Sequence, residues 1–111
     1  MKDHPAHPVV QKEACLALHN LAVNDENEAL IGRLGGIEAI LKAMKDRPAH
    51  PGVQEAACWA LCNLSANNAE NKVKLSNLGA KEPVGRAMAA ANATENTKEN
   101  GQELLDRLAR C

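Results

Sequence analysis

The sequence predicts an all-α fold in which similar helical units stack on one another as an α-solenoid. The first observation is composition: alanine, leucine, asparagine, glutamate and lysine are abundant, phenylalanine and tyrosine are absent, and a single tryptophan is the whole aromatic content. Such a chain favours helices packed through small and aliphatic side chains, and it holds no strand-like run. The second observation is an internal repeat, and the third is that glycine and proline separate its helical segments.

The internal repeat has a period of about 43 residues. At a shift of 43, residues 7–21 align with residues 50–64, and His-Pro, Val-Gln, Ala-Cys, Ala-Leu and Asn-Leu pairs recur in register. After a one-residue insertion near Asn67 the shift becomes 44, which aligns residues 26–44 with residues 70–88. So many identities in one register indicate duplicated structural units.

The chain is expected to form one domain over residues 1–111, which is long enough for a single modest core. Residues 1–23 are expected to supply the third helix of a partial unit, residues 24–66 a complete unit, and residues 67–111 a second unit. The sequence thus predicts about two and a third units, beginning part-way through a unit and ending in a helix with the polar outer face of a cap.

Helical periodicity and its interruptions predict seven helices. Asn24 is placed to cap the second helix, residues 35–36, both glycine, end it, and the proline-containing segment 47–51 ends the third. In the next unit Gly79 marks the equivalent turn, and Pro83 falls in a first helical turn, where proline is tolerated. The predicted helices cover residues 8–23, 25–34, 37–46, 51–66, 69–78, 81–91 and 95–110.

The first and last helices each have an apolar face and a polar face. The first helix places Leu18 and Leu21 in its expected core arc. The last helix has Leu104, Leu105 and Leu108 on one side and charged residues elsewhere. That polar outer face is typical of a terminal capping helix.

The helix predicted over residues 51–66 has the strongest helical pattern and contains Trp59. Steps of about 100° per residue place Trp59 and Asn63 on one face, with Glu55 and Cys62 beside them. The opposite arc is the expected core face and consists of Val53, Ala57, Ala60, Leu61 and Leu64. A tryptophan on the polar side is a stray surface residue, a residue covered by a neighbouring helix, or part of a binding ridge. Its position beside an amide favours the binding ridge.

This three-helix pattern resembles the armadillo repeat of β-catenin and importin-α. The resemblance covers nearly the whole chain and rests on the turn glycines and on the pattern Ala-x-x-Ala-Leu-x-Asn-Leu around Asn20 and Asn63. It implies a right-handed α-solenoid of three-helix armadillo repeats, as distinct from the two-helix HEAT repeat. It also implies that the third helices line a concave groove that binds an extended peptide or a partner protein.

The resemblance assigns roles to individual residues. The two asparagines are expected to form a ladder that hydrogen-bonds a peptide backbone, and the tryptophan to pack against the stem of a bound lysine or arginine. Leu16 and Glu103 stand where the tryptophan would be in the first and last copies. The expected peptide-binding residues are Leu16, Asn20, Glu55, Trp59, Asn63 and Glu103.

Charge and hydropathy narrow the class of partner. The net charge of −1 gives no long-range field for nucleic acid or an anionic membrane, and no apolar run spans a bilayer or forms a signal peptide. A protein or extended peptide is therefore the expected partner, in the cytoplasm or nucleus. Acidic side chains near the third helices favour a basic peptide, and basic ones at the amino end oppose it. The former are Glu55, Glu99, Glu103 and Asp106, and the latter are Lys12 and His19.

A zinc site is the sharpest alternative. Cys15 and His19 are four residues apart on one helix, as are Cys58 and Cys62 on its copy. Units that stack by near-translation direct both pairs to the same side, so the pairs would not meet, and neither a metal nor another cofactor is expected. The cysteines, including Cys111, are interpreted as free thiols in a reducing compartment.

No combination of residues predicts an enzyme. A nucleophile, a base and an orienting group do not recur at a usable spacing, and no phosphate-binding glycine loop is present. Turns and helix starts are the simplest roles for His4, His7 and His50, which adjoin prolines. Solvated helix faces are the simplest interpretation of Lys42, Lys45, Asp46, Lys72 and Lys74.

A second hypothesis is a self-associating structural module, a fragment or an engineered solenoid, with no ligand of its own. Its open amino end is expected to present Val10, Leu18, Leu21 and Ile37 to a second copy, which predicts a homodimer. The dependence of mass on concentration separates this hypothesis from peptide binding by a monomer.

Overall fold

The computed structural model describes residues 8–22, 24–66 and 68–109, and of residues 8–11 and 25 the backbone alone. All seven predicted helices are present, and each begins and ends within two residues of its predicted bounds; no strand occurs in the described ranges. The helices are α1 (Pro8–Leu21), α2 (Asp25–Arg33), α3 (Gly36–Asp46), α4 (Pro51–Ser65), α5 (Ala69–Asn77), α6 (Lys81–Ala89) and α7 (Glu95–Ala109). His4, His7, Cys111 and the side chain of Val10 lie outside what is described.

Polar caps and glycines set the helix boundaries, as the sequence predicts. Asn24 Oδ1 accepts hydrogen bonds from two backbone N–H groups of the first turn of α2, at 2.9 and 3.2 Å. His50 begins α4 in the same way, because its Nδ1 accepts from the backbone N–H of Val53 at 3.1 Å. Gly35 and Gly79 have φ angles of 90° and 72°, in the left-handed region that favours glycine, and they turn the chain between helices.

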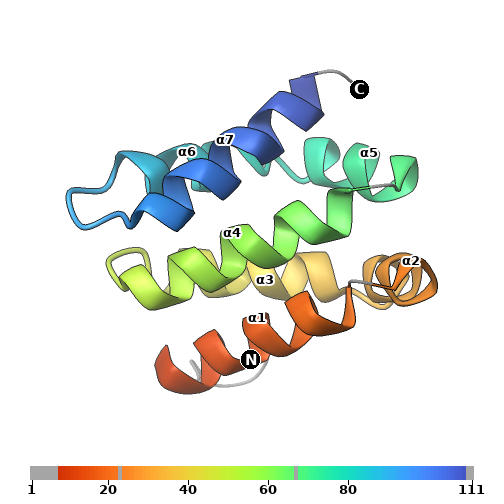
Figure 1. Ribbon diagram of the computed structural model, residues 1–111, viewed down its shortest axis with the longest axis horizontal. Helices are drawn as coiled ribbons and strands as arrows, with labels where there is room; N and C mark the ends of the chain where they lie inside the picture. Colours follow the sequence, from red (N-terminus) through yellow and green to blue (C-terminus); the bar gives the residue numbers. More distant parts are fainter. Residues whose placement is uncertain (1–7, 23, 67, 110–111) are drawn as a thin grey trace.

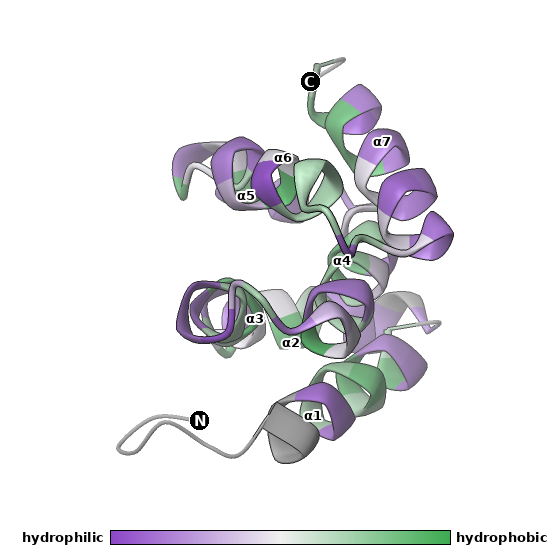
Figure 2. Ribbon diagram, turned by 90° about the vertical axis from the view of Figure 1, so that its left-hand side faces the viewer, coloured by the Kyte–Doolittle hydropathy of each residue, from purple (hydrophilic) through white to green (hydrophobic). Residues whose placement is uncertain are grey.

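The helices stack in layers, with the third helix of each unit along one side (Figure 1). Figure 2 shows α2 and α3 in one layer and α5 and α6 in the next, while α1, α4 and α7 follow one another beside them. α4 is central, because it packs against α1 on one side, α7 on the other, and α3 behind. We call the surface formed by α1, α4 and α7 the third-helix face.

The core surrounds α4. Many of its buried side chains are alanine or cysteine, which allows α1 and α7 to pack closely against it. The predicted core arc of this helix is confirmed, since every member is fully buried: Val53, Ala57, Ala60, Leu61 and Leu64. No helix in the described ranges is both long enough and apolar enough to cross a membrane.

The predicted core arc of α1 is confirmed for Leu18 and wrong for Leu21. Cys15 and Ala22 are buried. Leu18 is partly buried and packs against the core, whereas Leu21 is 51% exposed. In α4 the equivalent residue, Leu64, is fully buried because α4 also packs against α2, α3 and α5. Among the described helices α1 packs mainly on α4, so its side away from α4 stays exposed.

Two further residues are more buried than their helix positions alone indicate. Cys62, which the helix wheel places beside Trp59, is buried because Glu103 and Arg107 of α7 contact its sulfur. Ile37 is fully buried in the core, so it does not belong to an open amino end. The contacts of Cys62 come from a helix distant in sequence, which a single-helix wheel does not include.

Side chains that donate to backbone carbonyls join the layers. Asn71 of α5 is buried, and its Nδ2 donates to the carbonyl oxygens of Glu28 in α2 at 3.0 Å and Leu64 in α4 at 2.8 Å. Lys74 Nζ donates to the carbonyl of Gly32 at 2.6 Å, so this lysine is more than a solvated residue. These contacts fix the α5–α6 layer on the α2–α3 layer.

Candidate functional site

The exposed strip of α4 lies between α1 and α7, with Trp59 at its centre. Asn63 lies on the side toward α1, where it contacts His19. Glu55 lies on the other side, where its carboxylate accepts a hydrogen bond from the hydroxyl of Thr94, the residue before α7. The structure therefore brings the predicted residues of α4 onto the third-helix face, and two of them contact neighbouring elements.

Trp59 is held in place by His19 of α1. Their ring centroids are 3.9 Å apart, and the ring planes are inclined by 32°. His19 is only 9% exposed, whereas Trp59 is 40% exposed. The indole is thus partly covered by a neighbouring helix and partly open to solvent, which combines two of the readings that its sequence position allows.

Asn63 also contacts His19. Its Nδ2 donates to His19 Nδ1 at 2.7 Å and lies 3.5 Å from the His19 carbonyl oxygen. With the amide as donor, Nδ1 is the unprotonated nitrogen of a neutral ring. Burial lowers the pKa of His19, which also favours the neutral ring.

Glu103 and Arg107 of α7 occupy the positions that the tryptophan and asparagine occupy in α4. Arg107 donates to the carbonyl oxygen of Cys62 and pairs with Glu103 at 2.9 Å. Cys62 stands in the second copy where His19 stands in the first. Asn63 contacts the carbonyl oxygen of His19, and Arg107 makes the equivalent contact with the carbonyl oxygen of Cys62. This position on the third helices therefore joins each helix to the one before it.

The first copy of the same positions lies on α1. Leu16 is half-buried and packs against the core. Asn20 is exposed, and its side chain forms no hydrogen bond within the described part of the chain. Asn20 therefore presents its whole amide to solvent, and Leu16 adds apolar surface beside it.

The carboxylates of the face differ in how far they are already engaged. Glu103 is paired with Arg107, and Glu55 is hydrogen-bonded across to the start of α7. Asp106 accepts a hydrogen bond from the side chain of its helix neighbour Gln102 at 2.9 Å. Glu99 is exposed and has no ion-pair partner among the described residues, which leaves its charge available.

Three buried cysteines, Cys15 in α1 and Cys58 and Cys62 in α4, are protonated thiols at neutral pH. Burial raises the pKa of Cys15 to about 11, of Cys58 to about 12 and of Cys62 to about 11. In the described ranges, no three His, Cys, Asp or Glu side chains are grouped so that they could hold a metal ion. His19 instead faces the aromatic ring and amide of α4.

Sequence reasoning misses the roles of His19, Gln54 and Asn71. Gln54 is buried and donates to two carbonyl oxygens at the end of α3, at 3.1 and 2.9 Å. A signal exists for two of them, because Gln54 recurs as Gln11 and Asn71 as Asn27, and a polar residue kept in register indicates a structural hydrogen bond. His19 has no such counterpart in the repeat.

The fold and this face together define a helical repeat scaffold, and comparison with known families gives a match to one of its units. Residues 24–66 match the family model of the Armadillo/beta-catenin-like repeat. The matched residues contain α2, α3 and α4, one complete three-helix unit. This match supports assignment of the unit to the armadillo-repeat family, whose repeats form non-enzymatic modules for protein interaction. No curated protein and no solved structure gives a significant match.

Proposed function

We propose that the chain binds an extended peptide, or an extended segment of a partner protein, across the third-helix face. Trp59 is the apolar contact, and Asn20 and Asn63 hydrogen-bond the peptide backbone. The observation that most supports this proposal is that Trp59 is 40% exposed while its ring is stacked on His19. A ring already held in one orientation offers apolar contact at a small cost in conformational entropy.

The two asparagines support a backbone-directed contact. Asn20 is exposed, and both its amide donor and its acceptor are available. Asn63 uses Nδ2 toward His19 in its described bonds, which leaves Oδ1 as an acceptor for a peptide N–H. Contacts to a peptide backbone give affinity with little dependence on side-chain identity, so specificity falls to Trp59 and the charges around it.

The charges around Trp59 favour a basic peptide. Glu99 has no described ion-pair partner, and Glu55 and Glu103 lie on the same face. Glu103 is the exposed member of its pair with Arg107, so a ligand cation can approach that carboxylate from solvent. Leu16 adds apolar surface for the stem of a lysine or arginine.

Tryptophan fluorescence tests the proposal, because Trp59 is the single tryptophan of the chain. Basic, acidic and neutral extended peptides are titrated in parallel, and a saturating change in emission is expected with the basic set. Asn20→Ala is the sharpest variant: it removes no described contact, so affinity should fall while circular dichroism stays unchanged. Asn63→Ala should weaken binding as well, although it also removes the bond to His19.

Three outcomes of these titrations would contradict the proposal. No saturating change with any peptide class would overturn it, and a shift in emission on diluting the protein alone would place Trp59 in a contact between copies. Unchanged affinity in both asparagine variants would remove the amides from the site.

A second candidate function is self-association through the end of the stack that α2 forms. Leu30 and Leu34 of this region are 51% and 76% exposed. In the next unit Lys74 stands at the position of Leu30 and bonds back to the preceding layer, and Leu78 stands at the position of Leu34. Leu30 therefore faces away from α5, and the two leucines form an apolar end that a second copy can cover.

Sedimentation equilibrium over a range of protein concentrations tests self-association. A mass that rises with concentration is expected, and Leu34→Glu should return it to the monomer value. Val73→Glu is the matched control, because Val73 of α5 is a similarly exposed apolar residue at another place. A constant monomer mass at every concentration would exclude this candidate.

A further inference from the structure

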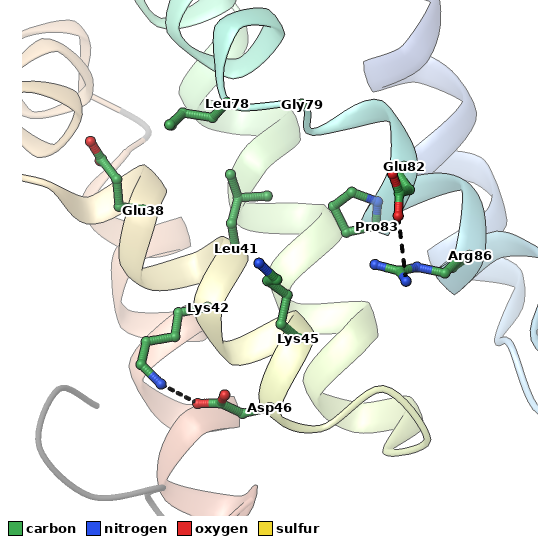
Figure 3. Close-up of a pocket in the computed structure, with 10 residues that line it drawn as sticks. All are labelled: Glu38, Leu41, Lys42, Lys45, Asp46, Leu78, Gly79, Glu82, Pro83 and Arg86. Atoms are coloured by element: carbon green, nitrogen blue, oxygen red, sulfur yellow. Dashed lines mark hydrogen bonds and ion pairs between the residues drawn. The ribbon is translucent and has the colours of Figure 1, made fainter.

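A groove between α3 and α6 lies apart from the third-helix face (Figure 3). Its larger cavity has a volume of about 610 Å³, and none of the residues that line it belongs to α1, α4 or α7. A smaller cavity of about 220 Å³ lies next to it and shares three of its lining residues. The groove is thus a separate surface from the one proposed to bind a peptide through Trp59.

Apolar side chains lie between the two helices that form the groove. Leu41 of α3 is nearly buried, Pro83 of α6 is half-buried, and Leu78, which follows α5, is 43% exposed. Figure 3 shows Leu41 and Pro83 on the two sides of the groove and Leu78 at one end. This arrangement leaves apolar surface that an apolar side chain of a ligand can cover.

Each carboxylate of the groove already has a cationic partner. Asp46 pairs with Lys42 at 2.8 Å, and Glu82 pairs with Arg86 at 3.6 Å. Glu38 is satisfied from the neighbouring layer, where Lys74 lies at 3.0 Å. The groove therefore has no acidic group left without a cation.

Lys45 is the basic residue of the groove that has no ion-pair partner among the described residues. Figure 3 shows its side chain extending into the space between α3 and α6, with Arg86 on the opposite wall. Lys45, Pro83 and Arg86 line both cavities. Arg86 and Glu82 are both largely exposed, and such pairs contribute little, so Arg86 can turn to an incoming anion.

We propose that this groove docks an acidic segment of a partner protein. One carboxylate of the segment lies between Lys45 and Arg86, and a neighbouring apolar side chain covers Leu41, Leu78 and Pro83. The unpaired positive charge selects an acidic ligand, and the apolar floor selects a peptide side chain over a simple anion. This site is independent of peptide binding on the third-helix face and prefers the opposite ligand charge.

Fluorescence anisotropy of a labelled peptide of alternating glutamate and leucine tests this docking site. Saturable binding is expected, and Lys45→Glu should weaken it by about tenfold or more, the loss of one charge-assisted contact. Lys81→Glu is the matched control, because this substitution changes the net charge by the same amount. Lys81 of α6 is exposed and lines neither cavity. Its affinity should stay within about twofold of the parent chain.

Further probes separate the two parts of the proposed contact. A peptide with serine in place of leucine should bind more weakly, and one with lysine in place of glutamate should not bind. Lys45→Gln provides a variant without charge reversal, and circular dichroism checks that each variant is folded. The emission of Trp59, recorded in the same titration, should not change, so this experiment and the one on the third-helix face succeed or fail separately.

The proposal is overturned by any of three results. Equal losses in Lys45→Glu and Lys81→Glu would indicate attraction to net charge alone. Equal affinity for the serine-containing peptide, with full displacement by inorganic phosphate, would indicate a site for simple anions. Absence of saturable binding of the glutamate-leucine peptide would remove the site altogether.

Discussion

His19 joins α1 to α4 through two different contacts, a ring stack on Trp59 and a hydrogen bond from Asn63. The hydrogen bond requires a neutral ring, because a proton on Nδ1 would point at the Asn63 amide donor. The same imidazole also holds the tryptophan of the proposed peptide site. At the scale of single residues, the helix junction and the candidate site therefore depend on one protonation state.

The free energy of unfolding should decrease as the pH falls below 6.5, the ordinary pKa of histidine. Burial lowers the pKa of His19 in the folded chain, so the unfolded chain binds a proton that the folded chain does not. This stabilisation is complete above the unfolded pKa and is lost as the pH drops below it toward the lowered pKa of the folded chain. Urea unfolding followed by circular dichroism measures it. His19→Gln should remove most of the difference, and an unchanged pH dependence in that variant would assign the effect to other groups.

The buried thiols should react slowly with a thiol reagent in the native chain. The raised pKa values of Cys15, Cys58 and Cys62, from about 11 to about 12, leave on the order of one thiol in a thousand or fewer ionised at about pH 8. A Cys111→Ser chain isolates these three positions, and absorbance after adding Ellman's reagent reports the rate. Rapid labelling before denaturant is added would show that the third helices separate easily.

At the scale of helices, two glycines differ in the space around them: Gly32 lies in the α2–α3 layer and Gly85 in the α5–α6 layer. A Cβ built on Gly32 of α2 lies 1.9 Å from Oδ1 of Asn71, the buried side chain that joins the layers. A Cβ built on Gly85 of α6 meets nothing within 4 Å. The first glycine is required by close contact between α2 and α5, and the second leaves a helix interior with an unused position for a side chain.

Gly32→Ala and Gly85→Ala should therefore change stability in opposite directions. Alanine favours a helix over glycine by about 1 kcal/mol, so Gly85→Ala should stabilise the chain by about 0.5–1 kcal/mol. In Gly32→Ala the clash with Asn71 should outweigh that gain and destabilise the chain by about 1–3 kcal/mol. Urea midpoints of both variants decide the matter, and equal stabilisation would mean that Asn71 moves aside without cost.

The helix boundaries were predictable because their signals are local. Asn24 and His50 cap the helices that follow them, and the glycines at positions 35 and 79 adopt positive φ. The contacts of the candidate site were not predictable in the same way, because the hydrogen bond between His19 and Asn63 joins residues 44 apart in sequence. A wheel drawn for one helix places Trp59 away from its own core, but it does not show which neighbouring helix covers part of that ring.

At the scale of the whole molecule, α4 is the helix on which the others depend. It packs against α1, α2, α3, α5 and α7, and its core arc is fully buried. Separation of α4 from any one neighbour would expose buried apolar side chains. Repeat proteins often unfold from their ends, but a short stack around one central helix is expected to unfold as a unit.

Trp59 fluorescence and far-ultraviolet circular dichroism should therefore give the same urea midpoint. The fluorescence reports the contact between α1 and α4, because the ring stacks on His19, whereas circular dichroism reports all helices. Coincident transitions are expected for a single cooperative unit. A fluorescence transition at lower urea would show that α1 detaches first, and the central role of α4 would then be limited to α2–α7.

The contacts between the α5–α6 layer and the α2–α3 layer constrain the donor side chains of α5 but not the side chains of the accepting helix. Asn71 and Lys74 donate to carbonyl oxygens of Glu28, Leu64 and Gly32, and a carbonyl is supplied by any amino acid. Random substitution of the accepting helix should therefore be tolerated wherever the new side chain points outward, with Gly32 as the exception. The surface of α2 is then free to acquire new specificities while the attachment of the next layer is inherited unchanged.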